Sequence, residues 1–360
     1  MTAVSKRPTT VHKGRGATGN PDNRFDAYSY EAIDDGWGSL DELPAPLRTI
    51  VQKDTARSLI NYNDSPDVGF DRSINPYRGC EHGCVYCFAR PTHAYLGLSP
   101  GLDFESRLFY KADAVELLRR ELARPRYRCA PLALGINTDA YQPLERRLGI
   151  TRQILEVLTE CRHPLTIVTK SALVERDLDL LTELARHDLV QVLFSVTTLK
   201  REIARTLEPR AAAPERRLQA MQRLSEAGVP TGVMVAPLIP VLTDAELEAI
   251  LRQARAAGAR EAGYVLVRLP HEVKELFKDW LATHAPLKAE HVMQRIRDCR
   301  GGREYDARFG TRMRGEGVFA DLLRQRFRKA YRDLGFEGLP PLNSELFAAP
   351  GAVRPQMELF

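Results

Sequence analysis

Between residues 61 and 270, short apolar runs alternate with longer segments of helical period. The short runs are rich in β-branched residues or leucine and are apolar on both faces, which is typical of buried parallel strands. The predicted strands are residues 73–78, 130–136, 164–169, 189–196, 231–239 and 263–269. The longer segments carry apolar residues at three- and four-residue spacing, as amphipathic helices do. The predicted helices are residues 151–161, 175–187, 214–227, 244–257 and 272–284.

Strands and helices in this order predict an α/β fold of six βα units. We expect a partial (β/α)6 barrel, an open form of the TIM barrel, with a doubly wound sheet as the alternative. In both architectures the chemistry lies at the C-terminal ends of the strands.

The flanks of the chain lack this alternation. We predict that residues 1–60 form a mobile basic tail and an irregular extension, and that residues 61–285 form the barrel. Residues 286–345 are predicted to be a helical addition. Residues 346–360, which contain two prolines and a glycine, are predicted to be an extended tail.

Composition excludes two broad classes of protein. A hydrophobic content of 44% with 28% charged residues is too apolar for a wholly disordered chain. The longest apolar stretch, residues 229–242, contains three prolines and is shorter than the ~20 residues of a membrane-spanning helix. The first twenty residues are polar and basic, without the apolar run of a secretory signal. We therefore expect a cytoplasmic protein with no membrane partner.

The net charge of +5 is modest, but basic residues gather near both ends of the chain. Such groups can contact the phosphates of nucleic acid, although a solvated helix face has the same composition. The two groups are Lys6, Arg7, Lys13 and Arg15, and Arg324, Arg326, Arg328, Lys329 and Arg332.

Three of the six cysteines lie within eight residues, as Cys80, Cys84 and Cys87, directly after the first predicted strand. Three thiolates close together can hold one metal centre, and a cubane 4Fe-4S cluster held by three cysteines leaves one iron open to a small molecule. A structural zinc site completed by His82 or His93 is the alternative, but zinc favours closed four-ligand sites that often use paired cysteines. The spacing therefore favours the cluster.

This three-cysteine loop, with aromatic Tyr86 before the third cysteine, resembles the hallmark of the radical S-adenosylmethionine (SAM) superfamily. From Lys13 onward the chain further resembles a bacterial branch labelled DNA repair photolyase, which is related to spore photoproduct lyase. The segments that carry the resemblance are 73–80 (SINPYRGC), 135–145 (GINTDAYQPLE), 169–171 (TKS), 206–210 (TLEPR) and 312–317 (RMRGEG).

The resemblance implies that a 4Fe-4S cluster and SAM are the cofactors. In this superfamily the open iron binds the methionine part of SAM, and an electron from the cluster cleaves SAM to a 5′-deoxyadenosyl radical. The resemblance also implies an electron donor such as flavodoxin or ferredoxin. The protein's part is to bind, orient and exclude water and oxygen.

Polar residues after the predicted strands are the candidates for SAM contacts. By family position we expect Tyr86, Asp139 and Glu145 to contribute, and Lys170 to pair with the carboxylate of SAM. Ser195, at the end of the fourth predicted strand, could reach the ribose, and Arg205 lies just beyond. Spore photoproduct lyase uses a cysteine of its own as hydrogen donor. No cysteine here aligns to it, so the photoproduct substrate does not carry over.

Three functions remain open at this point. The first is a lyase-like enzyme that acts on nucleic acid, as in DNA repair. The second is a radical enzyme that modifies RNA, a peptide or a small metabolite, and the third is an iron–sulfur redox sensor without catalysis.

The C-terminal pentapeptide, residues 356–360 (QMELF), is similar to the motif with which bacterial DNA enzymes dock on the replication sliding clamp. Gln356 and the pair Leu359 and Phe360 match in kind, and the preceding prolines favour an extended peptide. Packing against the protein's own surface is the alternative.

Overall fold

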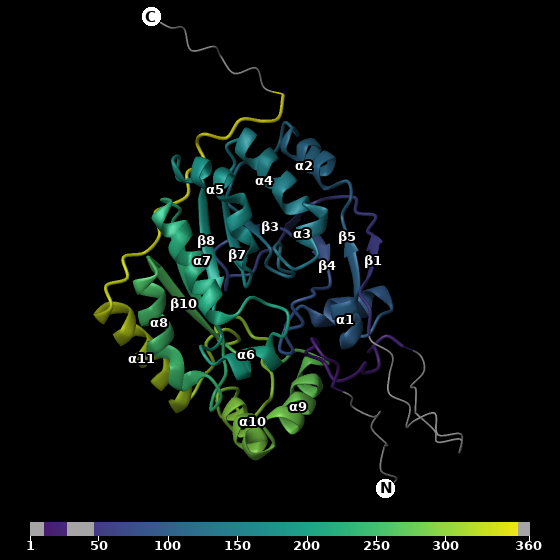
Figure 1. The fold of residues 1–360 in the computed structure, drawn as a ribbon, viewed down its shortest axis with the longest axis vertical. Coiled ribbons are helices and arrows are strands. Elements are labelled where there is room, and N and C mark those ends of the chain that lie inside the picture. The colour runs from purple at the N-terminus through teal and green to yellow at the C-terminus, as the bar shows by residue number, and fades with distance from the viewer. Residues whose placement is uncertain (1–10, 27–46, 352–360) are drawn as a thin grey trace, which may run out of the picture.

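The structure is a computed structural model that describes residues 11–26 and 47–351. Its main sheet has the order β10-β9-β8-β7-β6-β3-β2 (Figure 1). The strands are β2 (Ile60–Tyr62), β3 (Arg72–Ile74), β6 (Leu132–Leu134), β7 (Leu165–Thr169), β8 (Val190–Ser195), β9 (Thr231–Leu238) and β10 (Glu261–Leu266). Neighbours from β3 to β10 are parallel, and β2 is antiparallel to β3.

The parallel strands follow one another in chain order, without the reversal that defines a doubly wound sheet. The prediction of an open α/β barrel is therefore confirmed, and the doubly wound alternative is wrong. Among the described residues the sheet does not close, because β2 and β10 are its two edges. We call the edge formed by the C-terminal ends of the parallel strands the C-terminal rim, and the opposite edge the N-terminal rim.

The first predicted strand, residues 73–78, is wrong in extent. The chain divides at Asn75 and Pro76, and β4 (Tyr77–Arg78) pairs with β5 (Arg107–Tyr110) in a second sheet of order β1-β5-β4. The remaining strand of that sheet is β1 (Ile50–Lys53). Proline has no backbone N–H to donate to a ladder, so it ends β3 and lets the chain turn toward the cysteines.

Helices cover the main sheet largely where the periodicity predicts them. The α-helices are α1 (Leu102–Ser106), α2 (Ala114–Leu122), α3 (Glu145–Leu148), α4 (Ile150–Glu160), α5 (Leu178–Ala185), α6 (Arg201–Leu207), α7 (Pro214–Glu226), α8 (Leu247–Ala256), α9 (Val273–His284), α10 (Ala289–Asp298) and α11 (Val318–Asp333). Short 3-10 turns are η1 (Arg90–Leu96), η2 (Ala172–Asp177), η3 (Asp244–Glu246) and η4 (Pro286–Lys288). No helix in the described ranges has the length and apolar character needed to cross a bilayer.

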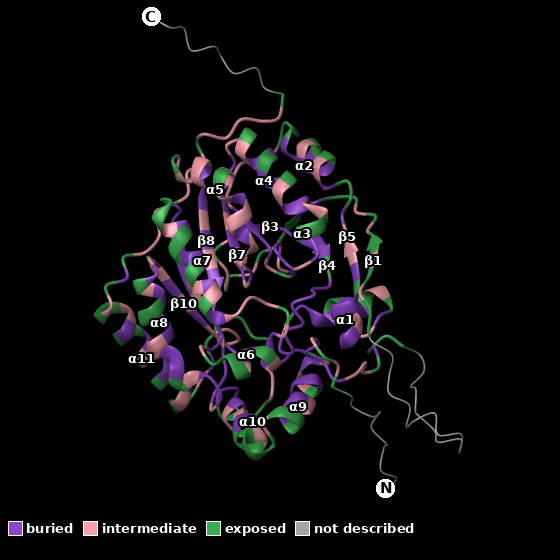
Figure 2. Ribbon diagram, viewed as in Figure 1, coloured by how far each residue is buried: buried purple, intermediate pink, exposed green. Residues whose placement is uncertain are grey.

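The two faces of the sheet differ in burial, contrary to the expectation that both are fully buried. In β7, β8 and β10, fully buried residues alternate with half-buried ones. The fully buried set, which includes Ile167, Val192 and Tyr264, shares one apolar core with helix residues such as Ile154 and Met221. Figure 2 shows the matching pattern on the outer helices, where buried and exposed bands lie side by side. The half-buried face therefore lies away from the helices.

The C-terminal segment, residues 335–351, runs across the N-terminal rim (yellow in Figure 1). Glu337 N and Gly338 N donate to Arg260 O, before β10, and Gln191 Nε2 donates to Pro340 O at 2.6 Å. Further along, Asn343 N donates to Asp188 O and Ala348 N to Cys161 O, each at 2.9 Å. The segment thus ties together the starts of β7, β8 and β10.

Candidate functional site

The three clustered cysteines lie on a loop, residues 79–90, that follows β4 and that we call the cysteine loop. Cys80 and Cys84 are buried, Cys87 is half-buried, and all three are free thiols. Successive turns wind the loop tightly: Gly83 N donates to Cys80 O at 3.3 Å, and Cys87 N to Cys84 O at 3.2 Å. The loop therefore presents three thiols within a few residues of compact chain.

Two glycines permit this winding. Gly79 and Gly83 have positive φ values of 76° and 68°, which side chains other than glycine rarely adopt. A Cβ atom on Gly79 would also lie 2.8 Å from Phe104 O, and one on Gly83 2.7 Å from a carboxylate oxygen of Glu105. The loop is thus packed closely against α1.

A buried ion pair between Arg90 and Glu105 holds the backbone of the cysteine loop. The guanidinium of Arg90 donates to Cys84 O at 2.8 Å and to Gly83 O at 3.1 Å, and it pairs with Glu105 at 2.5 Å. Glu105 also accepts from Gly16 N and Ala17 N, each at 2.9 Å. Arg90 and Glu105 are both fully buried, so they set the path of the backbone around Cys84.

A second clamp holds the start of the loop. Gln142 is fully buried, donates from Nε2 to Gly79 O at 3.2 Å and accepts from Glu81 N at 2.9 Å. It lies in the segment after β6, so it couples the C-terminal rim of the sheet to the cysteine loop.

The thiols fit a cationic metal cluster. Burial raises the pKa of Cys84 to about 12 and raises the pKa of Cys80 well above its usual range. Buried thiolates are therefore unfavourable here unless positive charge joins them, and metal binding supplies that charge and displaces the protons.

Neither histidine of the zinc alternative is a ready fourth ligand. His93 Nε2 lies 2.9 Å from Arg107 O, and its ring packs edge-on against Phe104. His82 Nδ1 lies 3.4 Å from the carboxylate of Asp139.

Asp139 joins three parts of the site. Its carboxylate accepts from Thr169 Oγ1 at 2.8 Å and from Lys170 N at 2.7 Å, both at the C-terminal end of β7. It also faces His82 of the cysteine loop. Asp139 therefore aligns the end of β7 with the loop.

A buried carboxylate that we did not predict, Glu208, holds Tyr86. The Tyr86 hydroxyl donates to Glu208 and lies 3.2 Å from Thr197 Oγ1, and Glu208 forms a buried ion pair with Arg217. Burial opposes ionisation of Glu208, but the charges of Arg217 and Lys170 outweigh it and lower its pKa to about 2. Glu208 is therefore a stable anion beside the cysteine loop.

Lys170 and Ser195 also lie at this site, whereas Arg205 does not join it. Lys170 Nζ is 5.9 Å from the ring centroid of Tyr86. Ser195 is buried at the end of β8, and its carbonyl accepts from Arg217 Nη1 at 2.8 Å. Arg205 is exposed on α6. Arg210, the last residue of the TLEPR segment, instead forms an ion pair with Glu81 of the cysteine loop at 3.1 Å.

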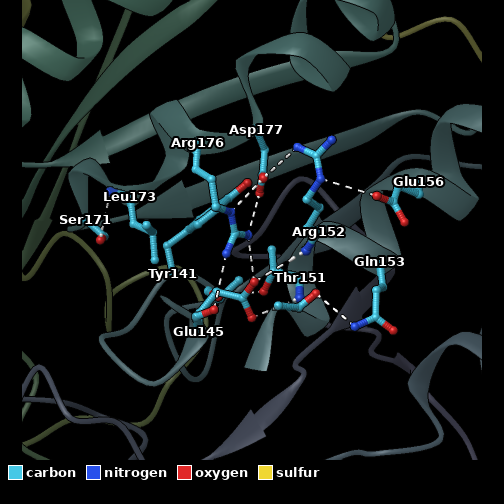
Figure 3. Close-up of polar contacts among 12 residues, drawn as sticks. Tyr141, Glu145, Thr151, Arg152, Gln153, Glu156, Ser171, Leu173, Arg176 and Asp177 are labelled. Atoms are coloured by element: carbon cyan, nitrogen blue, oxygen red, sulfur yellow. Dashed lines mark hydrogen bonds and ion pairs between the residues drawn. The ribbon is translucent and has the colours of Figure 1, made fainter. Parts of the chain in front are cut away.

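Glu145 belongs to a separate buried network (Figure 3). Its carboxylate accepts from Tyr77 Oη, from Thr151 N at 3.0 Å and from Arg176 at 2.7 Å. These partners hold α3, α4 and η2 together. The carboxylate of Glu145 is therefore already occupied by contacts within the fold, and we do not propose it as a SAM contact.

The predicted basic groups are largely paired. Arg326 binds Glu248 through two hydrogen bonds of 2.8 and 2.7 Å, and Arg324 binds Asp321 at 2.8 Å. Arg15 is buried and donates to Glu105 O at 2.6 Å, so it serves the fold. Lys6, Arg7 and the pentapeptide at 356–360 lie outside the described residues.

The residues that sequence reasoning missed are Arg90, Gln142, Glu208 and Arg217. Glu208 lies in the TLEPR segment and Gln142 in the segment 135–145, so both were within motifs already singled out, whereas Arg90 lies three residues after the last motif cysteine. Glu208 binds Tyr86, and Arg90 binds Glu105. No periodic pattern in the sequence links either residue to its partner.

Comparisons with known proteins show the family and the fold of this chain. The model of the radical SAM superfamily matches residues 74–254. An uncharacterized protein of Mycobacterium tuberculosis is 40% identical over 219 residues, which cover 60% of this chain and 64% of that protein. An uncharacterized protein of Methanocaldococcus jannaschii is 28% identical over 173 residues, which cover 48% of this chain and 62% of that protein. The chain therefore spans less than two thirds of these relatives.

Solved structures of spore photoproduct lyase have the same fold. The complex with dinucleoside spore photoproduct has a TM-score of 0.57 at 16% identity, covering 80% of each chain. A form with bound AdoMet and dinucleoside spore photoproduct has a TM-score of 0.56 at 16% identity, covering 80% of this chain and 79% of that one.

Proposed function

This chain belongs to the radical SAM superfamily, whose cofactors are a 4Fe-4S cluster and SAM, and on that premise we propose that Cys80, Cys84 and Cys87 are the cluster ligands. The observation that carries the proposal is that all three thiols sit on one tightly wound loop, held by Arg90 and Gln142. A cubane has four irons, so three cysteine ligands leave one for SAM.

When held by Cys80, Cys84 and Cys87, the cluster would supply an electron for the reductive cleavage of SAM. The chain's own residues bind and orient SAM. We assign Lys170 to the carboxylate of SAM, because its ammonium lies beside Tyr86 at the C-terminal end of β7. Ser195 is assigned to the ribose, since it ends β8 next to Thr197. Tyr86 is held by Glu208, and Asp139 positions Lys170 through its backbone N–H.

We further propose that the substrate is nucleic acid and that the reaction is a lyase-like step of DNA repair. The support is the fold shared with an enzyme solved in complex with a dinucleoside photoproduct. The half-buried residues of β7 and β8 belong to the same strands whose ends carry the site. An external reductant, of the flavodoxin or ferredoxin kind, supplies the electron.

The test of the cluster and the chemistry is anaerobic reconstitution. We expect about four irons per chain and 5′-deoxyadenosine when the dithionite-reduced protein meets SAM. Cys84→Ala is expected to lose both, whereas Cys129→Ala, away from the loop, keeps both. Stoichiometric zinc without iron would refute the cluster assignment, and iron without 5′-deoxyadenosine would favour a redox sensor.

The test of the substrate class is capture. Anaerobically purified protein is incubated with DNA, RNA and a peptide library, and the bound fraction is identified. Retention of DNA supports the repair proposal, and retention of RNA or peptide alone would replace it.

A further inference from the structure

Residues 306–317, which we call the arginine segment, bridge the two edges of the open sheet. On one side, Leu266 N at the end of β10 donates to Met313 O at 2.9 Å. On the other side, Gly310 N donates to Asp67 Oδ1 at 2.7 Å, and Arg312 pairs with the same carboxylate in the loop between β2 and β3. The segment therefore covers the lateral gap between β10 and β2.

A buried arginine holds the arginine segment in place. Arg300 donates to Thr311 O at 3.1 Å and to Arg312 O at 2.8 Å, while its other amine donates to Val267 O at 2.9 Å. Because Arg300 is buried, these bonds are shielded from water. The segment is thus a fixed surface beside the C-terminal end of β10.

Exposed aromatic rings with arginines over them mark this surface. Phe309 is 57% exposed and has the Arg312 guanidinium 4.4 Å from its ring centroid. Phe88, which directly follows Cys87, is 41% exposed and has Arg268 at 5.5 Å. Arg268 also contacts Met313 of the segment at 3.5 Å. The surface therefore extends to the cysteine loop.

Two cations on this surface form no direct ion pair within the described part of the chain, although the charge of Arg268 acts on Asp67 from a longer distance. Among the described residues, neither Arg268 nor Arg314 forms an ion pair, and the buried Nε of Arg268 has no hydrogen-bond partner. Arg314 is exposed and lies over the ring of Tyr264 at 4.5 Å.

The nearby acids are already paired. Asp67 binds Arg312, and both Asp306 and Glu316 bind Arg308. Positive charge is thus left beside exposed aromatic rings. On α11, by contrast, Arg324 and Arg326 are both paired with acids.

We propose that Phe88, Arg268 and the arginine segment form the surface that holds an unpaired polynucleotide strand against the cysteine loop. Phe88 and Phe309 stack on bases, and Arg268 and Arg314 contact phosphates. Unpaired bases expose the faces that such rings need, whereas an acidic peptide would use the arginines alone. The proposal rests on the proposed nucleic-acid substrate and locates where that substrate binds.

The experiment measures binding of a fluorescein-labelled single-stranded oligodeoxynucleotide to reconstituted full-length protein by anisotropy, over a range of salt. Phe309→Ala is expected to weaken binding about tenfold, as the loss of one stacked base does. Arg268→Gln/Arg314→Gln is expected to lower the slope of log affinity against log salt by about 1.4, for two phosphate contacts. The matched control, Arg324→Gln/Arg326→Gln on α11, removes the same charge from two paired arginines and should leave the slope within error.

The outcomes separate the two proposals. If wild-type protein binds neither single strand nor duplex, the proposed nucleic-acid substrate fails. If wild-type protein binds but the α11 variant loses as much as the Arg268/Arg314 variant, the arginine surface is wrong while the substrate class stands. Iron content and thermal unfolding are measured for every variant. If Arg268→Gln cannot hold iron, Arg314→Gln and Phe309→Ala, both at exposed positions, decide the matter.

Discussion

Buried charges beside the cysteine loop are paired one to one. Glu208 meets Arg217, and Glu105 meets Arg90, and the side chains of all four are almost completely buried. Burying such pairs costs desolvation, and removing one member leaves the other charge without compensation. Each pair therefore positions a neighbour, Tyr86 in the first case and Cys84 in the second, at a cost that the fold has to offset.

Glu208→Gln is expected to lower the free energy of unfolding by about 3 to 5 kcal/mol, because it leaves the charge of Arg217 buried and unpaired. Urea unfolding of the apo protein measures this loss. Since the folded pKa of Glu208, about 2, is below the ordinary value of 4.5, the stabilisation is complete above about 4.5 and is lost as the pH falls toward 2.

The double variant Glu208→Gln/Arg217→Met is the control for this pairing. It should be less destabilised than the sum of the single variants, because neither charge remains. Strict additivity would show that the two side chains do not act as a pair.

Lys170→Ala is expected to weaken SAM binding about 10- to 100-fold while iron content stays at the wild-type level, because a charge-assisted hydrogen bond is lost and no iron ligand is touched. Equilibrium dialysis with labelled SAM measures the affinity. Lys200→Ala removes the same charge from an exposed position before α6 and serves as the control. Equal affinity in both variants would remove Lys170 from the site.

At the residue scale, the sequence predicts what local motifs contain and little else. The cysteines, Tyr86, Asp139, Lys170 and Ser195 were predicted as site residues because each lies in or directly after a strand or motif. Glu145 also lies in such a motif, but its carboxylate binds Arg176 and belongs to a buried network that joins helices. A carboxylate after a strand can face the rim or face a helix, and only the tertiary contacts decide which.

At the scale of the element, the cysteine loop depends on residues outside its own motif. Arg90 begins η1 and donates to four backbone carbonyls as well as to Glu105: those of Cys84, Gly83, Pro100 and Gly101. A planar fork with this many donors has no equivalent among the other side chains. The loop conformation is thus imposed from η1 and α1.

Arg90→Met is expected to destabilise the protein by about 3 to 5 kcal/mol and to reduce iron retention, since Glu105 is left buried without its partner. Arg119→Met breaks an exposed ion pair with Glu160 and should cost at most ~1 kcal/mol. Thermal unfolding and iron content of both variants are compared. Full iron retention in Arg90→Met would show that the loop holds its shape without this anchor.

Elements with a strong period were predicted well, and the others were not. The predicted helices at 151–161, 214–227 and 272–284 agree closely with α4, α7 and α9. The sheet β1-β5-β4 was missed because its strands are short and β4 has only two residues. Such strands are formed by their partners, so their own sequence carries little periodic pattern.

At the scale of the whole molecule, the described part of the C-terminal segment ends at the rim opposite the proposed site. Ala348 lies at the N-terminal rim, bonded to Cys161 O before β7, whereas the cysteine loop lies at the opposite rim. The last described residues are therefore anchored on the side of the sheet away from the proposed site.

We expect a fluorescent peptide of residues 354–360 to bind the host's replication sliding clamp through Leu359 and Phe360, each of which contributes roughly 1.5 to 3 kcal/mol when buried. Anisotropy measures the affinity. The same peptide with both residues changed to Ala should bind at least about tenfold more weakly. Equal binding of the two peptides would end the clamp hypothesis and leave self-packing as the reading of the pentapeptide.

The segments that complete the sheet come late in the described part of the chain, after all of its strands. The arginine segment bridges β10 and the loop between β2 and β3, and residues 335–351 cross the N-terminal rim. The cysteines are translated long before either segment. Both segments therefore have to fold back onto strands that were translated before them.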